Sequence, residues 1–458
     1  MVTIKNKKQL IQNGQTKLDR KARTLALNCL ESAVNSVDPK QIIKSKVQLA
    51  NSTLKVNKYS FDLRKFKHVY LVGGGKASGS MAAGLEQILG KHLTCGLVNV
   101  SESDMSQTKI VQLHAASHPI PDESGVEGTR RMLEMAEQAE GDDLVICLIS
   151  GGGSSLMPLP RGEISIADKR TLTDALLKSG ATINEINTVR KHISDFKGGW
   201  FAKKAYPATI LNLILSDVVG DPLDFIASGP AVPDSTTFSD AVRVLKKYRL
   251  WDKAPPPIRQ VLTEGEKGII PETPKAGDDA FKKAYNVVIG NNRSASLAAH
   301  EFLRKAGLNT LLLTATLEGE AKQVGTILAT IAREISTSGN PVPKPAGILV
   351  GGETTVIVTG KGLGGRNQEI PLAASPRLDG LDGAVIASLT TDGVDGPTDA
   401  AGAIADGKTF ARAAEAGLRP EQFLGENDSY HFFEKLEDLV FTGPSGTNVN
   451  DISVIIVL

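Results

Sequence analysis

Four glycine-rich loops follow apolar, strand-like runs in this chain, and their residue types suit the binding of an anion. They lie at residues 72–78, 150–155, 360–366 and 442–447. Glycines allow several backbone N–H groups to converge on one anion, and a helix that begins after the loop adds partial positive charge. Lys76 and Arg366 add full positive charges to two of the loops. The chemistry that these loops predict is phosphate binding.

The Lys76 loop matches neither of the standard nucleotide-binding motifs. Tyr70 occupies the first glycine position of a P-loop, and Ala77 follows the lysine. The dinucleotide fingerprint is half present, because Ser78 stands where its third glycine belongs. A tight strand-to-helix turn with an exposed lysine is the competing interpretation. If the loop binds phosphate, the contacting residues are Gly73, Gly74, Gly75 and Ser78, with Lys76 as the charged group.

The second loop combines three glycines with two serines after the most apolar run of the chain. Its hydroxyl groups can add donors to the backbone N–H groups, whereas a serine nucleophile is the alternative. The G-x-S-x-G elbow of serine hydrolases is absent, and no downstream acid–histidine pair demands a triad. Anion binding is therefore favoured, through Gly151, Gly152, Gly153, Ser154 and Ser155.

Arg366 ends the third loop, directly after Gly364 and Gly365. A flexible loop that ends in arginine suits a bidentate grip on a carboxylate or phosphate. The alternative is a surface turn with a solvated arginine. High glycine density is costly unless the backbone must approach something closely, which favours a functional loop.

Two acidic residues that follow apolar runs are candidates for magnesium binding. Asp217 comes at the end of the apolar run 210–215, and Asp392 follows the run 384–387. Mg²⁺ uses one or two carboxylates together with water and phosphate oxygens, which is the arrangement a nucleotide-dependent enzyme needs. Asp-Gly and Asp-Pro are also ordinary turn sequences, so the evidence for Asp392 is evenly balanced. For Asp217, metal binding and acceptance of a hydroxyl proton both remain open.

The elements that position these loops alternate between strand-like and helical patterns. Short runs that are apolar on both faces occur at 69–72, 95–98, 110–113, 144–149 and 210–215, which is typical of a parallel sheet covered by helices. A proline-rich stretch at 251–280 has the composition of an interdomain connection. A second alternation begins at 286–290 and includes a predicted strand at 354–359. We therefore predict two α/β domains, a Rossmann-like α/β/α domain at 1–265 and a second α/β domain at 280–458, with the active site in a cleft between them.

Length and charge narrow the class of protein. The chain has 458 residues and a net charge of +1, and it has no long block of like charge, so nucleic acid is not an expected partner. No stretch approaches the roughly 18 apolar residues of a membrane span. The three cysteines are widely spaced in apolar runs, as expected for reduced buried thiols. These features predict a cytoplasmic protein without a membrane partner, and they leave a homo-oligomer open.

Taken together, the motifs resemble those of class II glycerate kinases, the glycerate 2-kinase family with a C-terminal MOFRL domain. The resemblance covers nearly the whole chain from Leu18 onward. It is carried by the segments at 73–78, 117–122, 149–160, 189–199, 215–230, 351–355, 364–369, 391–403 and 442–451. The seventeen residues before Leu18 resemble an added tail. Ser445 stands where this family is expected to have threonine, which is a small departure.

The resemblance implies ATP-dependent phosphorylation of D-glycerate at its 2-hydroxyl group, with a divalent cation such as Mg²⁺. The family's proposed catalytic lysine and arginine correspond to Lys76 and Arg366. Phosphoryl transfer depends on charge neutralisation and positioning, so loop amides, a lysine, an arginine and Mg²⁺ are sufficient for it. Two alternatives stay open: a nicotinamide-dependent hydroxypyruvate reductase, and a non-catalytic sensor of sugar acids or nucleotides.

Overall fold

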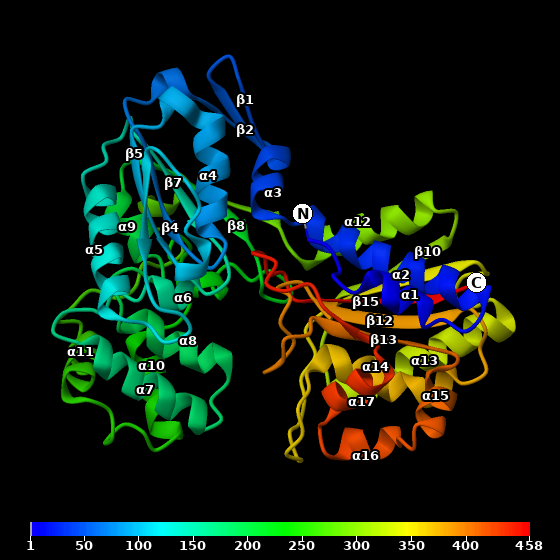
Figure 1. Cartoon of the computed structure of the whole chain (residues 1–458). Coiled ribbons are helices and arrows are strands. Elements are labelled where there is room, and N and C mark those ends of the chain that lie inside the picture. Colours follow the sequence, from blue (N-terminus) through cyan, green and yellow to red (C-terminus); the bar gives the residue numbers. More distant parts are fainter. Residues whose placement is uncertain (1) are drawn as a thin grey trace. The chain divides into compact units, whose positions relative to one another are not determined.

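The computed structural model describes residues 2–458 and divides into two compact units (Figure 1). The N-terminal unit contains Pro39–Ile289. The C-terminal unit contains residues 290–458 together with residues 2–38. No helix within residues 2–458 is long and apolar enough to cross a membrane.

The N-terminal unit is built on a six-stranded sheet with the strand order β6-β5-β4-β7-β8-β9. Its strands are β4 (Val69–Gly74), β5 (Cys95–Val100), β6 (Val111–Ala115), β7 (Leu144–Ile149), β8 (Thr209–Leu215) and β9 (Ala284–Gly290). The strands from β4 to β8 pair in parallel. Every residue of β7 and β8 is buried, as expected for central strands covered on both faces. The five runs that the sequence predicts as strands all lie in this sheet.

Helices cover both faces of that sheet, so this unit has the predicted α/β/α layers (Figure 1). α4 (Ser78–Leu89) packs on one face, and α5 (Glu123–Glu137) packs on the other with α9 (Trp200–Ala205). A separate helical group has its own apolar core and consists of α7 (Ile166–Lys178), α8 (Ile183–His192), α10 (Phe238–Lys247) and α11 (Pro256–Glu266). The remaining elements are α3 (Pro39–Lys46), α6 (Gly153–Leu156) and a small antiparallel sheet of β1 (Val47–Ala50), β2 (Thr53–Val56) and β3 (Tyr59–Asp62).

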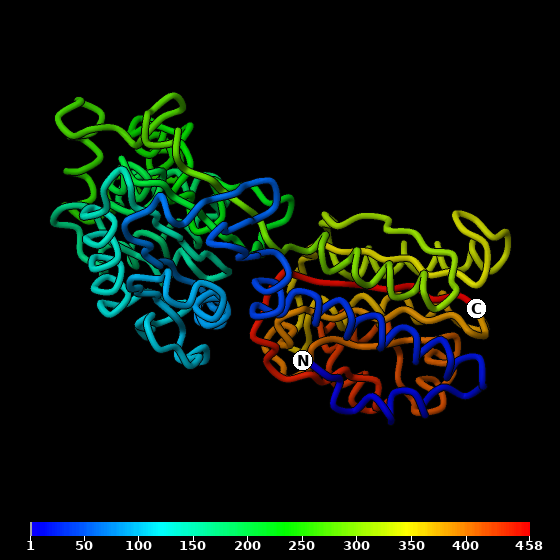
Figure 2. The backbone as a smooth tube through the Cα atoms, turned by 90° about the horizontal axis from the view of Figure 1, so that it is seen from above, coloured from blue at the N-terminus to red at the C-terminus, as the bar shows by residue number. Residues whose placement is uncertain are grey.

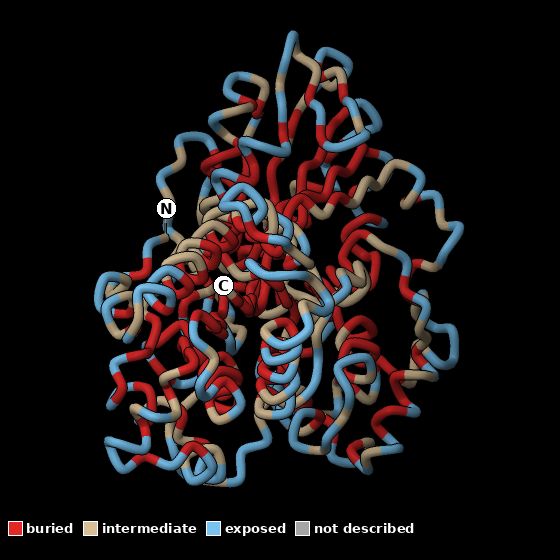
Figure 3. Tube along the Cα trace, turned by 90° about the vertical axis from the view of Figure 1, so that its right-hand side faces the viewer, coloured by how far each residue is buried: buried red, intermediate tan, exposed pale blue. Residues whose placement is uncertain are grey.

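The C-terminal unit contains a mixed six-stranded sheet with the order β10-β11-β15-β12-β13-β14. Its strands are β10 (Asn309–Leu317), β11 (Ala346–Gly352), β12 (Ala384–Thr390), β13 (Gly402–Asp406), β14 (Leu439–Val440) and β15 (Asp451–Val457). Only β10 and β11 pair in parallel. β11, β12 and β15 are buried along their whole length and form the centre of the sheet, where Figure 3 shows buried residues in red.

Helices also cover both faces of the C-terminal sheet. α2 (Lys17–Ser36) and α12 (Asn292–Lys305) lie side by side on one face, as Figures 1 and 2 show. α13 (Ala321–Ser338) and α14 (Arg366–Leu378) pack on the opposite face. The smaller helices of this unit are α1 (Lys7–Gln12), α15 (Thr409–Glu415), α16 (Pro420–Gly425) and α17 (Ser429–Leu436).

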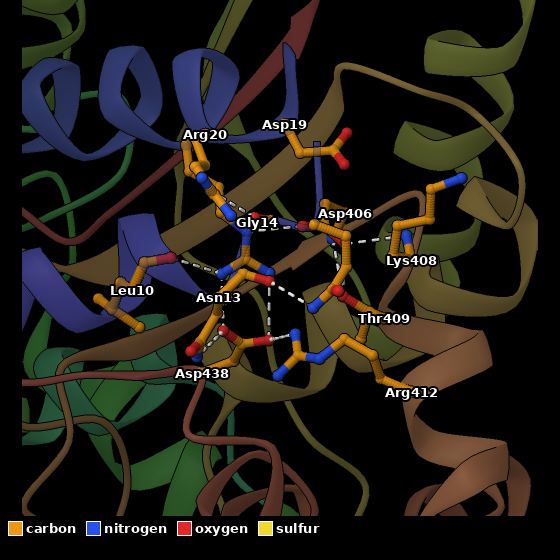
Figure 4. A network of polar contacts seen from close by, with 12 residues as sticks. Leu10, Asn13, Gly14, Asp19, Arg20, Asp406, Lys408, Thr409, Arg412 and Asp438 are labelled. Carbon is orange, nitrogen blue, oxygen red and sulfur yellow. Dashed lines mark hydrogen bonds and ion pairs between the residues drawn. The ribbon is translucent and has the colours of Figure 1, made fainter. Parts of the chain in front are cut away.

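The start of the chain packs with the C-terminal unit, which differs from the predicted boundaries 1–265 and 280–458. Arg23 on α2 is fully buried and donates to Asp406 at 2.6 Å, to Asp438 at 2.7 Å and to the Leu10 carbonyl at 2.8 Å. Figure 4 shows these three partners in the surrounding polar network. The helical periodicity of α2 indicates a buried face, but it does not say which sheet the helix covers. Residues 2–17 of the predicted tail belong to the same unit, and their helix α1 supplies this carbonyl from Leu10.

Three further expectations are corrected by the structure. The stretch 251–280 is part of the N-terminal unit, and its prolines begin helix α11, because proline suits the first turn of a helix. The run at 286–290, predicted to start the second domain, lies in β9, beside β8 in the first sheet. Residues 354–359 form no strand and contribute only an isolated bridge at Thr355. An apolar run shows that a segment can pair, but it does not identify its partner.

Candidate active site

The Lys76 loop and the Ser150 loop lie next to each other where the order of the parallel sheet reverses. β4 and β7 are neighbours; β5 and β6 continue the sheet on one side, and β8 continues it on the other. In open α/β sheets, ligands bind beyond the carboxyl ends of the strands at such a switch point. The loops that follow β4 and β7 therefore occupy the expected ligand position of this unit.

Hydrogen bonds join the two loops directly. The Lys76 amide donates to the Gly151 carbonyl at 2.8 Å, and the Ala77 amide donates to Ser150 Oγ at 3.0 Å. The Ser78 hydroxyl is fully buried and lies 3.1 Å from Ser150 Oγ. These groups, which the sequence suggests as phosphate donors, are used here to hold the loops together. What the first loop presents is the half-buried side chain of Lys76.

Glycine is required at this junction because the two loops approach so closely. A Cβ atom added to Gly75 would lie 2.1 Å from Ser150 Oγ, and one added to Gly73 would lie 2.1 Å from the Leu148 carbonyl oxygen. Both glycines also have positive φ angles, 154° and 138°, which side chains rarely adopt. Gly73 and Gly75 thus serve the fit between neighbouring strands and loops.

Lys76, His118 and Asp217 surround the first two glycines of the Ser150 loop. A Cβ added to Gly151 would lie 2.1 Å from Asp217 Oδ2. One added to Gly152 would lie 2.7 Å from His118 Cδ2 and 3.1 Å from Lys76 Cγ. The structure therefore brings the predicted residues Lys76 and Asp217 to the same loop and adds His118 beside them.

His118 stands in an environment that disfavours its protonated form. Burial lowers its pKa, and the positive charge of Lys76 lowers it further. The pattern Ser-His-Pro in a loop carries no ligand or triad spacing, so only the folded chain shows that His118 lies beside Lys76. A neutral imidazole here can exchange hydrogen bonds with a ligand without adding charge.

Ser154 of the second loop does not have the contacts of a nucleophilic serine. The Ser154 hydroxyl lies 3.0 Å from the Ser228 hydroxyl, which in turn donates to Asn187 at 3.2 Å. A nucleophilic serine is activated by an adjacent general base, usually a histidine. The contacts of Ser154 therefore favour a binding role for this loop over the nucleophile alternative.

Arg366 begins α14 in the C-terminal unit and is held by two carboxylates. Its guanidinium makes two hydrogen bonds to Asp451, of 2.6 and 3.0 Å, and a third of 2.8 Å to Glu353. Gly364 and Gly365 pack tightly before it, since a Cβ on Gly365 would lie 2.3 Å from the Asp395 carboxylate. The guanidinium thus makes a bidentate contact with a carboxylate of its own unit, and the predicted grip on a ligand stays a prediction.

The acids around Arg366 have unusual proton affinities. Burial raises the pKa of Asp395 to about 7, and the nearby Asp451 raises it further against the effect of hydrogen bonds from the start of α14. Burial likewise raises the pKa of Asp451 to about 6, against the attraction of Arg366. This half of the predicted site is therefore a closely coupled group of one cation and several buried acids.

Asp392, the second predicted metal ligand, has its carboxylate within a turn. Its Oδ1 accepts from the Thr390 hydroxyl at 2.9 Å and from the Val394 amide at 3.2 Å. The loop at 442–447 lies against it, because the Ser445 amide donates to the Asp392 carbonyl at 3.0 Å. Across residues 2–458, no three His, Cys, Asp or Glu side chains form a group that could enclose a metal ion.

The chain folds into two α/β units with glycine-rich loops at the switch point of the first sheet, and it is similar to known proteins over nearly its whole length. Residues 25–263 match a domain of unknown function (DUF4147), and residues 346–451 match the MOFRL family. A D-glycerate 2-kinase from Thermotoga maritima is 40% identical, over 94% of this chain and 97% of the relative. An Agrobacterium vitis protein with the provisional name hydroxypyruvate reductase is 38% identical over 98% of both chains.

A solved structure supports the same assignment. The crystal structure of a glycerate kinase from Thermotoga maritima superimposes with a TM-score of 0.85 at 39% identity, covering 95% of this chain and 99% of that one. The chain belongs to the glycerate kinase family with a C-terminal MOFRL domain. The family resemblance and the two-domain α/β fold predicted from the sequence are confirmed.

Proposed function

We propose that this protein is a glycerate 2-kinase, which transfers the terminal phosphoryl group of ATP to the 2-hydroxyl group of D-glycerate and forms 2-phosphoglycerate. The observation that carries the proposal is the grouping of Lys76, His118 and Asp217 around one glycine loop at the switch point of the sheet. Phosphoryl transfer needs positioned charge more than covalent chemistry, and this group supplies a cation and an acid side by side.

Lys76 is the proposed electrostatic catalyst of the N-terminal unit. Charge accumulates on the oxygens of the transferring phosphoryl group, and a lysine ammonium group at that position lowers the barrier. Lys76 extends from a loop whose backbone is fixed by hydrogen bonds to Gly151 and Ser150, so its position is well defined. Such preorganisation is what makes an electrostatic contact effective in catalysis.

Asp217 is the proposed partner of the acceptor hydroxyl or of Mg²⁺. Its carboxylate lies at the end of β8 beside Gly151, where a hydroxyl group of glycerate could donate to it. Mg²⁺ commonly uses one or two protein carboxylates and takes its other ligands from phosphate and water, so a single aspartate fits this ion without a protein cage. When bound, the ion would neutralise charge on the phosphate oxygens. Asp217 suits that role better than Asp392, because Asp217 lies beside the same loop as Lys76, whereas the Asp392 carboxylate lies within a turn of the C-terminal unit.

Arg366 is the proposed contribution of the C-terminal unit. We infer that it meets the reacting phosphates when the two units close on the substrates, as lids and domains do in many kinases. Its guanidinium is oriented by Asp451 and Glu353 and stays partly exposed, with 29% of its side chain accessible. A guanidinium has five N–H groups, and these two carboxylates engage three of them, so the remaining donors can reach a ligand.

Turnover with the two substrates tests the proposal. Incubation with D-glycerate, ATP and Mg²⁺ should give ADP and phosphoglycerate, and incubation with hydroxypyruvate and NADH should give no oxidation of NADH. The reverse pattern would favour the reductase that the Agrobacterium relative is named for. Ligand binding without turnover in either assay would favour a sensor. We expect the enzyme to work in the cytoplasm, where ATP is available, and size-exclusion chromatography with light scattering would measure its oligomeric state.

A further inference from the structure

A cationic pocket lies beside the Ser150 loop within the N-terminal unit, and its lining does not include Lys76, His118 or Asp217. It has a volume of about 610 Å³ and is lined by Ser154, Ser155 and parts of α7 and α8. Pockets of roughly 300–1,000 Å³ accommodate ligands of nucleotide size. A three-carbon acid would fill only a small part of this volume.

Four cations line the pocket, against a single acid. The cations are Lys169, Arg170, Arg190 and Lys197. The acid, Asp174, already pairs with Lys178 at 2.7 Å. The lining therefore has an excess of positive charge that favours an anionic ligand.

The two lysines are buried without a carboxylate partner of their own. Lys169 is 6% exposed, and its Nζ donates to the Pro158 carbonyl at 2.7 Å. Lys197 is 2% exposed, and its Nζ donates to the Ser154 carbonyl at 3.0 Å. Burying a charge without an opposite charge is costly, so such a pair is expected where a ligand supplies the missing negative charge.

Proton affinities of the cluster agree with this geometry. Burial lowers the pKa of Lys169 to about 7, and the nearby Arg190 lowers it further, with Asp195 acting in the opposite direction. Asp195 already pairs with Arg161 at 2.9 Å. Burial also lowers the pKa values of Lys197 and Arg190, with no carboxylate acting in the opposite direction on either.

Apolar side chains form the outer part of the pocket. Ile120 and Leu177 line it and are 63% and 59% exposed, and Pro119, Pro121 and Pro158 complete this surface. Large apolar side chains that stay exposed beside polar groups often mark a binding site. The pocket thus combines exposed apolar side chains, suited to a nucleobase, with buried cations, suited to a phosphate chain.

We propose that this pocket binds the nucleotide of the phosphate donor, with its phosphate chain at Lys197, Arg190 and the Ser154–Ser155 hydroxyls and its base near Ile120 and Leu177. The inference rests on the proposed kinase function. It gives the Ser150 loop two roles, because Gly151 and Gly152 face Lys76, His118 and Asp217 while Ser154 and Ser155 line the pocket. A phosphate chain bound in the pocket would extend along this loop toward Lys76.

The test measures binding of the non-hydrolysable analogue AMP-PNP, with Mg²⁺, by titration calorimetry. Lys197→Met and Arg190→Met should each weaken binding by about 10- to 100-fold, the usual effect of losing a charge-assisted hydrogen bond. Lys204→Met is the matched control, because Lys204 is exposed on α9 and pairs with Glu137, and neither residue lines the pocket. It should bind AMP-PNP as the wild type does.

A second readout separates ligand binding from a structural role. Without ligand, Lys197→Met should raise the melting temperature, because it removes a buried charge of like sign to its neighbours. If Lys197 instead stabilises the fold, Lys197→Met should lower the melting temperature. If Lys197→Met does not fold, Arg190→Gln still allows AMP-PNP binding to be measured, because Arg190 is only partly buried.

The outcomes distinguish this inference from the proposed function. Wild-type binding of AMP-PNP that the pocket variants weaken, with no phosphorylation of glycerate, would uphold the nucleotide site and reject the kinase. Normal kinase turnover with unchanged AMP-PNP affinity in both variants would reject the site and keep the kinase. A raised KM for glycerate alone would assign the pocket to the acid, and failure of the wild type to bind AMP-PNP would also overturn the inference.

Discussion

Replacing Gly151 with alanine tests whether the position of the Asp217 carboxylate matters for the reaction. The new Cβ would lie 2.1 Å from Asp217 Oδ2, whereas real Cβ contacts are essentially never shorter than 3.0 Å. The carboxylate oxygen therefore has to move by about 0.9 Å. Gly151 does not have a positive φ angle, so alanine itself strains the backbone little at this position.

A displacement of this size should reduce kcat strongly. Misplacement of a reacting group by about 1 Å can cost on the order of 100-fold in rate, which corresponds to about 2.7 kcal/mol in the activation free energy. The melting temperature should change little, because Asp217 is partly exposed and the new Cβ meets only side-chain atoms of Asp217, not backbone. We therefore expect a loss of kcat without a comparable loss of stability.

Gly141→Ala is the matched control for this experiment. Its new Cβ would lie no closer than 3.8 Å to its neighbours, all in Pro207, which is an ordinary contact in the same unit. The assay couples ADP formation from ATP and D-glycerate to NADH oxidation, with thermal unfolding measured on the same samples. A Gly151→Ala enzyme within about threefold of the wild-type kcat would refute the role assigned to Asp217.

Three further substitutions address other parts of the account. Lys76→Ala should lower kcat by about 100- to 1,000-fold, as the loss of one preorganised electrostatic contact does; near-normal turnover would remove Lys76 from the mechanism. Arg23→Met should destabilise the C-terminal unit by about 3–5 kcal/mol in urea unfolding, because it leaves the buried Asp406 and Asp438 with one cation fewer; a cost below about 1 kcal/mol would contradict the packing of α2 with this unit. Asp395 has its pKa raised to about 7, so the folded protein holds a proton that the unfolded chain releases. Its contribution to the unfolding free energy is complete below about pH 4 and is lost as the pH rises to about 7, by roughly 4 kcal/mol. Asp395→Asn should remove this part of the pH dependence and leave the part due to Asp451, and a slope between pH 4 and 7 equal to that of the wild type would show that Asp395 is ionised throughout.

The sequence predicts the strands of the first sheet well, because their residues are apolar on both faces and turn residues bound them. It does not predict that β9 joins this sheet or that α2 covers the other one. Those pairings depend on contacts between segments far apart in the chain, such as Arg23 with Asp406 and Asp438. Local periodicity shows which face of an element is buried, but it carries no information about the partner.

The residues of the candidate site that directly follow strands could be predicted from the sequence, and the others could not. Lys76, Asp217 and the Ser150 loop each follow a recognisable strand, and strand ends of a parallel sheet meet at one edge. His118 and the pocket cations Lys169, Arg190 and Lys197 come from loops and helices without a ligand motif. Their function depends on burial and on which charges lie nearby, and neither is visible in the order of residues.

Phosphorus NMR of the product tests the central claim most directly. After incubation of the protein with D-glycerate, ATP and Mg²⁺, we predict ADP and a new phosphate monoester whose signal is split into a doublet by the single proton on C2 of 2-phosphoglycerate. The Lys76→Ala variant should give almost none of this signal in the same time. A triplet, from phosphate on the 3-hydroxyl group, would contradict the assigned position of transfer, and the absence of any new phosphate ester would contradict the kinase itself.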